Sequence, residues 1–387
     1  MKIGIVLSKP PTYSETFFNS KIKGLQSNGF DVVLLVQKKD SNFKLCKTKV
    51  APAVYKKNLL LQFFTTLLVG LKFIFFSRRI LKFIQLEKQE NKNWSQVFKN
   101  LYTNAHILTT KLDWVHFGFV TMAIQSEHVA KAINAKMAIS MRGFDVDVFP
   151  LKHKEEYVSI WKHVDKVHSI SNYLLEKAYV LGLSKNIAYQ IITPALDTSK
   201  FINPSALQLK PIEFVTISRL HWMKGLHYTL EALAILKSKG VNFKYTIIGS
   251  GKAFESLSFA IHELDLKQEV VLVGDKPQKD IINYLSKANM YLQYSNSEGF
   301  CNATLEAQAM GLLCIVSNGG GLIENVLDKQ TGWVVPKRNP EALANKIIEV
   351  IHLPEVEKNK ISKQAIARVH EKFNLQLQEK QFVAFYE

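Results

Sequence analysis

Short apolar runs alternate with segments of helical periodicity along this 387-residue chain. Strands separated by helical segments are typical of parallel sheets with helical crossovers. The sequence therefore predicts an α/β fold. In the first half the expected strands are Ile3–Leu7, Val32–Val36, Trp114–Phe117, Met137–Met141 and Val167–Ser171. In the second half they are Phe214–Ile217, Tyr245–Ile248, Val270–Val273, Met290–Tyr294, Leu313–Val316 and Trp333–Val335.

The two sets of strands predict two doubly wound, Rossmann-like domains, each large enough to bury its own core. A polar stretch bracketed by prolines at 203–211 marks the boundary. We expect one domain over residues 1–203, a second over 204–365, and a final helical stretch over 366–387. Ligands bind at the carboxyl ends of parallel strands, so the expected site lies in the cleft between the domains.

One segment, 56–88, combines an apolar run with basic flanks. On a helical wheel, Gln62, Thr65 and Lys72 fall on one arc and Phe63 and Leu67 fall opposite, so the helix is amphipathic. Lys72 and the polar stripe argue against a transmembrane span. Two interpretations stay open: a helix packed in the domain core, or a helix lying in a membrane interface.

The net charge of +17 is concentrated around this segment: between residues 35 and 100, 14 basic residues face 3 acidic ones. Such a region fits nucleic acid, an anionic membrane or an acidic substrate. We find no nucleic-acid-binding motif, which disfavours the first. The cysteines Cys46, Cys301 and Cys314 show no disulfide or zinc spacing, and the N-terminus reads as a strand and not as a signal peptide. We therefore expect a reduced, cytoplasmic protein at the inner face of the membrane.

Two candidate phosphate-binding features follow strands of the second half. Arg219 and Lys224 lie five residues apart in a strand-to-helix turn, where a planar fork and a point charge suit a diphosphate. Gly249 and Gly251 end the next strand and let backbone approach a ligand closely. Alone, each feature is weak.

A third candidate feature is the stretch Ser297–Gly311, with two glutamates. Asn302 is expected to cap a helix, so free backbone amides near Phe300, Cys301 and Asn302 are expected to face a phosphate or sugar oxygen. Glu306, one turn inside the helix, is placed for a ribose diol, and Glu298 precedes the helix. Together these groups predict a site for a nucleotide at one end and a sugar at the other.

The order of these motifs closely resembles retaining glycosyltransferases of family 4, which have the two-domain GT-B fold. The residues that carry it are Ser218-Arg-Leu with Lys224-Gly, Gly249-Ser-Gly, Glu298 and Glu306, Gly319-Gly-Gly-Leu-Ile-Glu324 and Thr331-Gly332. In the first half Ser14-Glu-Thr-Phe, Val115-His-Phe-Gly, Arg142-Gly-Phe-Asp and Ile192-Thr-Pro-Ala-Leu-Asp resemble the branch involved in exopolysaccharide and lipopolysaccharide synthesis.

The resemblance implies a role for each matching residue. Arg219 and Lys224 would neutralise the donor diphosphate, Glu306 would bind the ribose, and Glu298 would face the donor sugar. It also implies a donor-binding second domain, an acceptor-binding first domain, a final helix that crosses back to the first domain, and neither metal nor cofactor. The acceptor-side candidates are Tyr13, Ser14, Glu15 and His116.

The chain departs from the family at two places. Arg142-Gly stands where many members have His-Gly, so Arg142 is the candidate for that donor contact, and Pro10-Pro-Thr-Tyr replaces a glycine-rich first loop. Asp145-Val-Asp147 resembles the metal-binding Asp-x-Asp of an unrelated glycosyltransferase fold, and we interpret it as chance.

The predicted function is transfer of a sugar from a nucleotide-diphosphate sugar to a glycan or lipid-diphosphate-linked glycan in cell-surface polysaccharide synthesis. Two alternatives remain: a sugar-nucleotide epimerase of the same fold, and a membrane-attached, non-catalytic sugar-nucleotide-binding assembly protein. The sequence leaves the donor sugar and the acceptor open.

Overall fold

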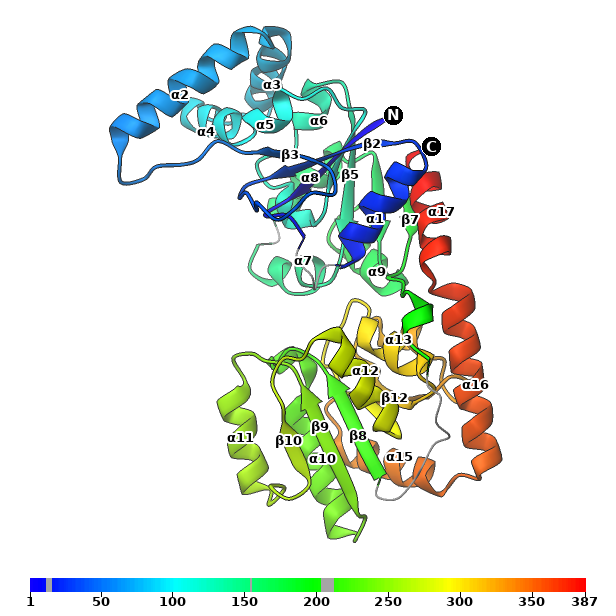
Figure 1. The fold of residues 1–387 in the computed structure, drawn as a ribbon. Helices are drawn as coiled ribbons and strands as arrows, with labels where there is room; N and C mark the ends of the chain where they lie inside the picture. The colour runs from blue at the N-terminus through cyan, green and yellow to red at the C-terminus, as the bar shows by residue number, and fades with distance from the viewer. Residues whose placement is uncertain (12–15, 154, 203–211) are drawn as a thin grey trace. The chain divides into compact units, whose positions relative to one another are not determined.

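The computed structural model describes residues 1–11, 16–153, 155–202 and 212–387 (Figure 1). Contacts divide the chain into two units. The first contains 1–170, 174–192 and 378–387, and the second contains 171–173 and 193–377. The expected boundary at 203–211 and the candidates Tyr13, Ser14 and Glu15 lie outside the described residues.

The first unit is built on a seven-stranded parallel sheet with the order β3-β2-β1-β4-β5-β6-β7. Its strands are β1 (Lys2–Leu7), β2 (Asp31–Val36), β3 (Lys47–Val50), β4 (Trp114–Phe117), β5 (Lys136–Met141), β6 (Lys166–Ser169) and β7 (Ala188–Ile191). The helices of residues 16–200 are α1 (Thr16–Ser27), α2 (Leu59–Ile74), α3 (Ser77–Gln89), α4 (Trp94–Thr103), α5 (Ala105–Leu108), α6 (Val129–Ala132), α7 (Phe144–Asp147), α8 (Glu156–His163) and α9 (Asn172–Val180), with short 3-10 turns η2 (Val120–Met122), η3 (Phe149–Leu151) and η4 (Thr198–Lys200).

The second unit contains a six-stranded parallel sheet with the order β10-β9-β8-β11-β12-β13. Its strands are β8 (Ile212–Ile217), β9 (Phe243–Ile248), β10 (Val270–Leu272), β11 (Met290–Gln293), β12 (Leu313–Ser317) and β13 (Trp333–Val335). The helical elements of residues 212–387 are η5 (Trp222–Lys224), α10 (Leu226–Ser238), α11 (Phe254–Glu263), α12 (Gln278–Lys287), α13 (Asn302–Ala309), α14 (Leu322–Asn325), α15 (Pro340–His352), α16 (Glu355–Lys372) and α17 (Leu375–Tyr386), of which α17 belongs mostly to the first unit. The α/β prediction is confirmed, with two parallel sheets.

Every strand expected from the sequence is present, and the structure adds β3 and β7. The inner strands β1 and β2 are buried along nearly their whole length because helices cover parallel sheets on both faces, and they therefore read as continuous apolar runs. The two additional strands lie at the edges of the first sheet. Their sequences, Lys-Thr-Lys-Val and Ala-Tyr-Gln-Ile, are partly exposed and lack an apolar run.

The last turns of α17 complete the core of the first unit. Phe382, Phe385 and Tyr386 are buried there beside Phe17 of α1 and Trp114 of β4. The C-terminal residues thus pack on the N-terminal sheet, and Figure 1 shows the red end of the chain beside the first, blue helix.

A buried polar network lies beneath this helix. His116 Nδ1 is 2.6 Å from Tyr386 Oη and 3.2 Å from Lys21 Nζ, and His116 Nε2 is 2.8 Å from Ser140 Oγ. Ser140 Oγ in turn lies 2.7 Å from His168 Nδ1. Lys21 is buried and its ammonium group also stands 4.5 Å from the ring centre of Phe382. Within the described residues no carboxylate forms an ion pair with Lys21.

Helix α2 turns its polar face toward the protein and its apolar face toward solvent, the reverse of an ordinary amphipathic surface helix. Its polar stripe faces the first unit: Thr65 Oγ1 lies 3.1 Å from Tyr102 Oη, and Gln62 accepts a hydrogen bond from the amide of Tyr55 at 2.9 Å. Its apolar side chains face outward, and Phe63 is 64% and Ile74 67% exposed. The other exposed apolar side chains of α2 and its end are Leu59, Leu60, Leu61, Phe64, Leu67, Leu68, Leu71 and Phe75.

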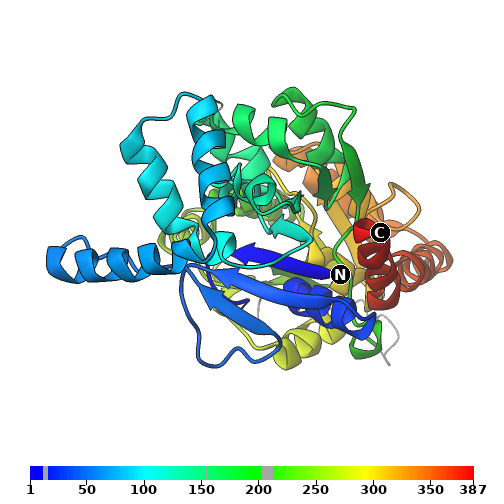
Figure 2. The ribbon, with the colours of Figure 1, turned by 90° about the horizontal axis from the view of Figure 1, so that it is seen from above.

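Helix α2 therefore does not pack in the core of the described chain. Helix α3, which follows it, does pack, through Ile80, Phe83 and Leu86. Figure 2 shows α2 projecting from the first unit as a separate blue rod. In the described residues no single helix has the length and apolar character to cross a membrane; α2 and α3 would do so only jointly, and they are bent by 109°.

We expect Lys21→Met to raise the free energy of unfolding by about 1–3 kcal/mol. Burial, followed by the charge of Arg142, lowers the pKa of Lys21 well below its usual range. Below about pH 10.4 the lysine takes up a proton in the unfolded state but resists doing so in the folded state. The free energy of unfolding of the wild type therefore decreases as the pH falls below that value. The gain in Tm should accordingly be larger at pH 6 than at pH 10. Lys23→Met, exposed on the same helix, is the matched control, and an equal gain at both pH values would contradict the burial argument.

Candidate functional site

The expected motifs of the second unit lie on loops that follow neighbouring strands. In the sheet β8 lies between β9 and β11, and β12 follows β11. The loops after these strands contact one another directly through backbone. A Cβ on Gly225 would collide with the carbonyl oxygen of Tyr294, and one on Gly249 with that of Ser218. Both glycines also have positive φ, 62° and 135°. Glycine is therefore favoured at each position both by the lack of space for a Cβ and by the backbone conformation.

Gly251 belongs to the same contact. A Cβ there would meet the carbonyl oxygen of Leu220, and its φ is 155°. The sequence predicted that Gly249 and Gly251 let backbone approach a ligand. The structure gives a different reason for both glycines, which is the close packing of the β8 and β9 loops. Their contact with a donor stays a prediction.

Lys224 and Glu298 form an ion pair at the centre of these loops. They come from η5 and from the loop after β11, and they are only 13% and 15% exposed. Ser295 Oγ lies 3.4 Å from the same Glu298 oxygen. The pairing is a finding that the sequence did not specify, since the two residues are 74 positions apart.

Arg219 stands at the end of β8 with an exposed side chain that has no hydrogen-bond partner in the described part of the chain. Burial lowers the pKa of His221, and the charges of Arg219, Lys224 and Lys252 lower it further. These cations therefore surround one imidazole. With only Glu298 paired to Lys224, the cluster has a surplus of positive charge, which suits a diphosphate.

Two kinds of unsatisfied donor accompany this charge. The Oγ atom of Ser218, next to Arg219, is buried without a partner among the described residues. The backbone amides of Gly299 and Phe300 precede α13 and likewise make no hydrogen bond in the ranges that the structure describes. Amides before a helix N-terminus attract anions and sugar oxygens.

The expectation for Cys301 and Asn302 needs correction. Asn302 is the first residue of α13 and not its cap, which is Cys301. The Cys301 amide is not free, because it donates to Asn325 Oδ1 at 2.9 Å, and Asn325 Nδ2 donates back to the Cys301 carbonyl at 3.0 Å. Cys301 is also buried, and burial raises the pKa of its thiol to about 11. The prediction of a free amide is therefore wrong for Cys301, whereas the amide of Phe300, which was also predicted, makes no hydrogen bond among the described residues.

Glu306 lies in the second turn of α13, half-buried. Burial raises the pKa of its carboxyl to about 7, and its carboxylate has no hydrogen-bond partner among the described residues. A carboxylate without a donor would be stabilised by hydrogen bonds from two hydroxyl groups of a ligand. This supports the ribose-binding role of Glu306, which stays a prediction.

In the first unit, Arg142 follows β5, and its guanidinium lies 4.0 Å and 4.7 Å from the ring centres of Phe17 and Phe18. The Asp145 carboxylate accepts hydrogen bonds from the amides of Arg142, Gly143 and Val120 at 2.9–3.1 Å. Asp145 therefore folds the loop, and the interpretation of Asp145-Val-Asp147 as a chance match stays a prediction.

His116 does not lie where the acceptor-side prediction needs it. Its side chain is fully buried within the network of Lys21, Ser140 and Tyr386 described above. Burial lowers the pKa of His116, and the charges of Lys21, His168 and Arg142 lower it further. The reason for the error is its strand: every residue of β4 is buried, so no side chain of it reaches a surface.

Sequence reasoning named Ser218 only as part of the Ser218-Arg-Leu motif, without a role of its own, and did not single out His221 or Lys252. All three lie within three residues of Arg219, Lys224 or Gly251, so the signal was proximity to a recognised motif residue. Their participation depends on the loop packing, which single-sequence patterns do not reveal.

The fold and this site together define a GT-B-type protein. The Anabaena protein Alr3699/HepE in complex with UDP has a TM-score of 0.74 to this chain at 15% identity, over 99% of this chain and 98% of that one. The same protein with UDP-glucose gives a TM-score of 0.72 at 14% identity over the same shares of the two chains. At such identity the similarity establishes the fold alone.

The model of the family described as glycosyl transferases group 1, the family 4 glycosyltransferases, matches residues 197–368 of the chain. The chain is 31% identical over 241 residues to the amylovoran biosynthesis glycosyltransferase AmsK of Erwinia amylovora, covering 59% of this chain and 58% of that one. It is 26% identical over 400 residues to the putative colanic acid biosynthesis glycosyltransferase WcaL of Escherichia coli K12, covering 97% of each. The resemblance inferred from the motifs is confirmed.

We expect Glu306→Gln to raise the free energy of unfolding at pH 8 by about 1–3 kcal/mol and to have little effect at pH 5. The carboxyl has a pKa of about 7 when folded and about 4.3 when unfolded, so the wild type loses stability as the pH rises between these values. Thermal unfolding at both pH values measures the difference. Glu263→Gln, exposed on α11, is the control; an equal gain for both variants would contradict this assignment.

Proposed function

We propose that the protein transfers a sugar from a nucleotide-diphosphate sugar to a hydroxyl group of a glycan or lipid-diphosphate-linked glycan, with retention at the anomeric carbon. The observation that carries this proposal is the ion pair of Lys224 and Glu298 at the adjacent ends of β8 and β11. It joins a phosphate-binding cation to a hydroxyl-binding carboxylate, which is what a donor with a charged and a neutral half requires.

The residues divide between the two halves of the donor. Arg219 and Lys224 take the diphosphate, and the free amides of Gly299 and Phe300 take phosphate or sugar oxygens. Glu298 accepts from the sugar hydroxyls and Glu306 from the ribose. The solved Anabaena complexes contain UDP or UDP-glucose, which supports a nucleotide sugar as donor class.

The reaction forms a bond between the acceptor oxygen and the anomeric carbon and breaks the bond from that carbon to the β-phosphate oxygen. The acceptor proton passes to the departing diphosphate. Negative charge grows on the diphosphate in the transition state, so Arg219 and Lys224 stabilise the transition state more than the bound donor. The only carboxylate next to Lys224 in the described site is engaged by that lysine, which favours attack on the same face over a covalent intermediate.

We expect Lys224→Ala to lower turnover by about two to three orders of magnitude, as for removal of a group that stabilises transition-state charge. The assay incubates the full chain with a panel of nucleotide sugars and measures the released nucleoside diphosphate. Lys237→Ala, which removes a surface pair with Asp265 at the far end of α10, is the matched control and should retain activity. Near wild-type release by Lys224→Ala, with an unchanged Tm in both variants, would rule out the assigned role.

The same assay separates the alternatives. An epimerase converts the sugar without releasing nucleoside diphosphate, and a non-catalytic binding protein does neither.

We propose further that the exposed face of α2 docks on an anionic membrane surface. The outward side chains are apolar over the whole helix, and the chain carries no Asp or Glu between Asp40 and Glu87. Lys56, Lys57 and Arg78 flank the apolar face with positive charge. An apolar face bordered by basic residues is the composition of a helix that lies in a bilayer interface and attracts anionic lipid.

The docking surface is tested with sedimentation of vesicles made of phosphatidylethanolamine and phosphatidylglycerol. Wild type should sediment with them at low salt, sediment less at high salt, and fail to bind pure phosphatidylcholine. The triple variant Phe64→Ser, Leu67→Ser, Leu71→Ser should lose binding while its Tm stays unchanged, since these side chains are exposed.

The control is Phe254→Ser with Phe259→Ser, which removes two exposed apolar side chains from α11 and should bind as wild type does. Equal binding by the triple variant and the wild type would contradict docking through α2. So would a concentration-dependent increase in mass without lipid that the triple variant abolishes, because α2 would then be an interface between copies of the chain.

A further inference from the structure

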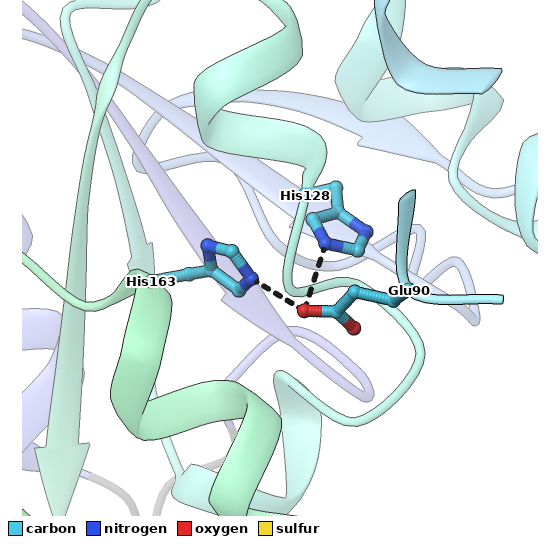
Figure 3. A group of neighbouring side chains, drawn as sticks. All are labelled: Glu90, His128 and His163. Carbon is cyan, nitrogen blue, oxygen red and sulfur yellow. Dashed lines mark hydrogen bonds and ion pairs between the residues drawn. The ribbon is translucent and has the colours of Figure 1, made fainter. Parts of the chain in front are cut away.

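Glu90, His128 and His163 converge in the first unit from three separate segments (Figure 3). Glu90 follows α3, His128 precedes α6, and His163 ends α8. His163 Nε2 lies 2.8 Å and His128 Nε2 3.4 Å from the same oxygen, Glu90 Oε1. All three ligand atoms lie within 4.8 Å of one another.

The protonation of His128 is constrained by its other ring nitrogen. Nδ1 stands 2.5 Å from the buried carboxylate of Glu87, which also accepts from Asn100 and Lys92. An ionised carboxylate only accepts, so Nδ1 carries the proton. In the neutral imidazole Nε2 then presents a lone pair toward the Glu90 oxygen. Two acceptors that face each other repel, and a metal ion bound between them would turn this repulsion into attraction.

The ligand set suits a metal ion. Two imidazoles and one carboxylate are a zinc ligand set, and bonds of about 2.0–2.1 Å in a tetrahedron separate ligand atoms by about 3.3 Å. The distances of 2.8 Å and 3.4 Å to Glu90 Oε1 bracket that value. Zinc ligands from distant segments have no short sequence spacing, which explains why the chain showed no zinc motif.

The groups behind the ligands support the same interpretation. Histidines that bind metals usually donate their second N–H to a carboxylate, as His128 does to Glu87. The second oxygen of Glu90 accepts from Ser159 Oγ at 2.9 Å, which fixes the carboxylate plane. The Lys92 ammonium pairs with Glu87 and Glu127 at 3.0 Å and 3.3 Å, so a divalent cation would meet a net negative surrounding from Glu87 and Glu90.

The exposure of the three residues leaves an entry path. The side chain of His128 is 1% exposed, whereas those of His163 and Glu90 are 17% and 26% exposed. A partly open side admits the ion and a fourth ligand such as water, while the buried side excludes competing solvent.

We propose that Glu90, His128 and His163 bind one divalent transition-metal ion, for which zinc is the test ion. The ion joins the end of α3 to α6 and α8. Because α3 follows α2 directly, it would fasten the base of the helix whose apolar face is exposed. This role is structural and goes beyond the proposed sugar transfer, which uses residues of the second unit.

The test uses the full chain without an affinity tag, in a Cys46→Ser background that removes the one cysteine that is not buried. After treatment with a chelator, zinc should raise Tm by several degrees, and one equivalent should remain bound through gel filtration. Co²⁺ in its place should give the visible absorption of a tetrahedral site. Glu87→Gln should weaken zinc binding by about 10- to 100-fold.

His163→Asn and Glu90→Gln should abolish both the zinc-dependent rise in Tm and the bound equivalent. His153→Asn, which breaks an exposed His–Glu pair with Glu156 in the same unit, is the matched control and should retain them. The proposal is overturned if the wild type binds no more zinc than His163→Asn does. It is also overturned if zinc leaves the wild-type Tm unchanged. Sugar-transfer activity is not needed for either measurement.

Discussion

Contact between backbones at the carboxyl ends of the second sheet is the constraint on which the candidate donor site depends. Gly225, Gly249 and Gly251 bring their loops against carbonyl oxygens of the neighbouring loops, where any Cβ would collide. This packing sets Lys224 of one loop beside Glu298 of another. The charged groups are therefore positioned by residues that have no side chain, and their geometry is fixed before any donor binds.

The sequence was sufficient for the fold wherever burial imposed a pattern. Inner strands such as β1 and β11 are buried on both faces and produce apolar runs, so each was expected. The edge strands β3 and β7 have one free edge and partly exposed side chains, so their sequences carry no comparable pattern. These two segments become strands because they pair with an inner strand, and that pairing is a tertiary contact that a local sequence pattern does not show.

For the site, residue identities were easier to predict than contacts. Motif order was enough to predict Arg219, Lys224 and both glutamates as site residues, whereas the partner of a backbone amide depends on a distant residue. Asn325 occupies the Cys301 amide from 24 positions away, which no local pattern indicates. The amphipathic helix shows the same limit. Periodicity established two faces on α2, whereas only the structure shows that the apolar one points outward.

The return of α17 to the first unit has a consequence for synthesis of the chain. Phe382, Phe385 and Tyr386 fill the core against strands made from residues near the N-terminus. During translation, all strands of the second unit are synthesised before these residues are. Until then, the part of the first sheet that α17 covers keeps its apolar side chains exposed. The half of the protein that is translated first is thus the half that finishes folding last.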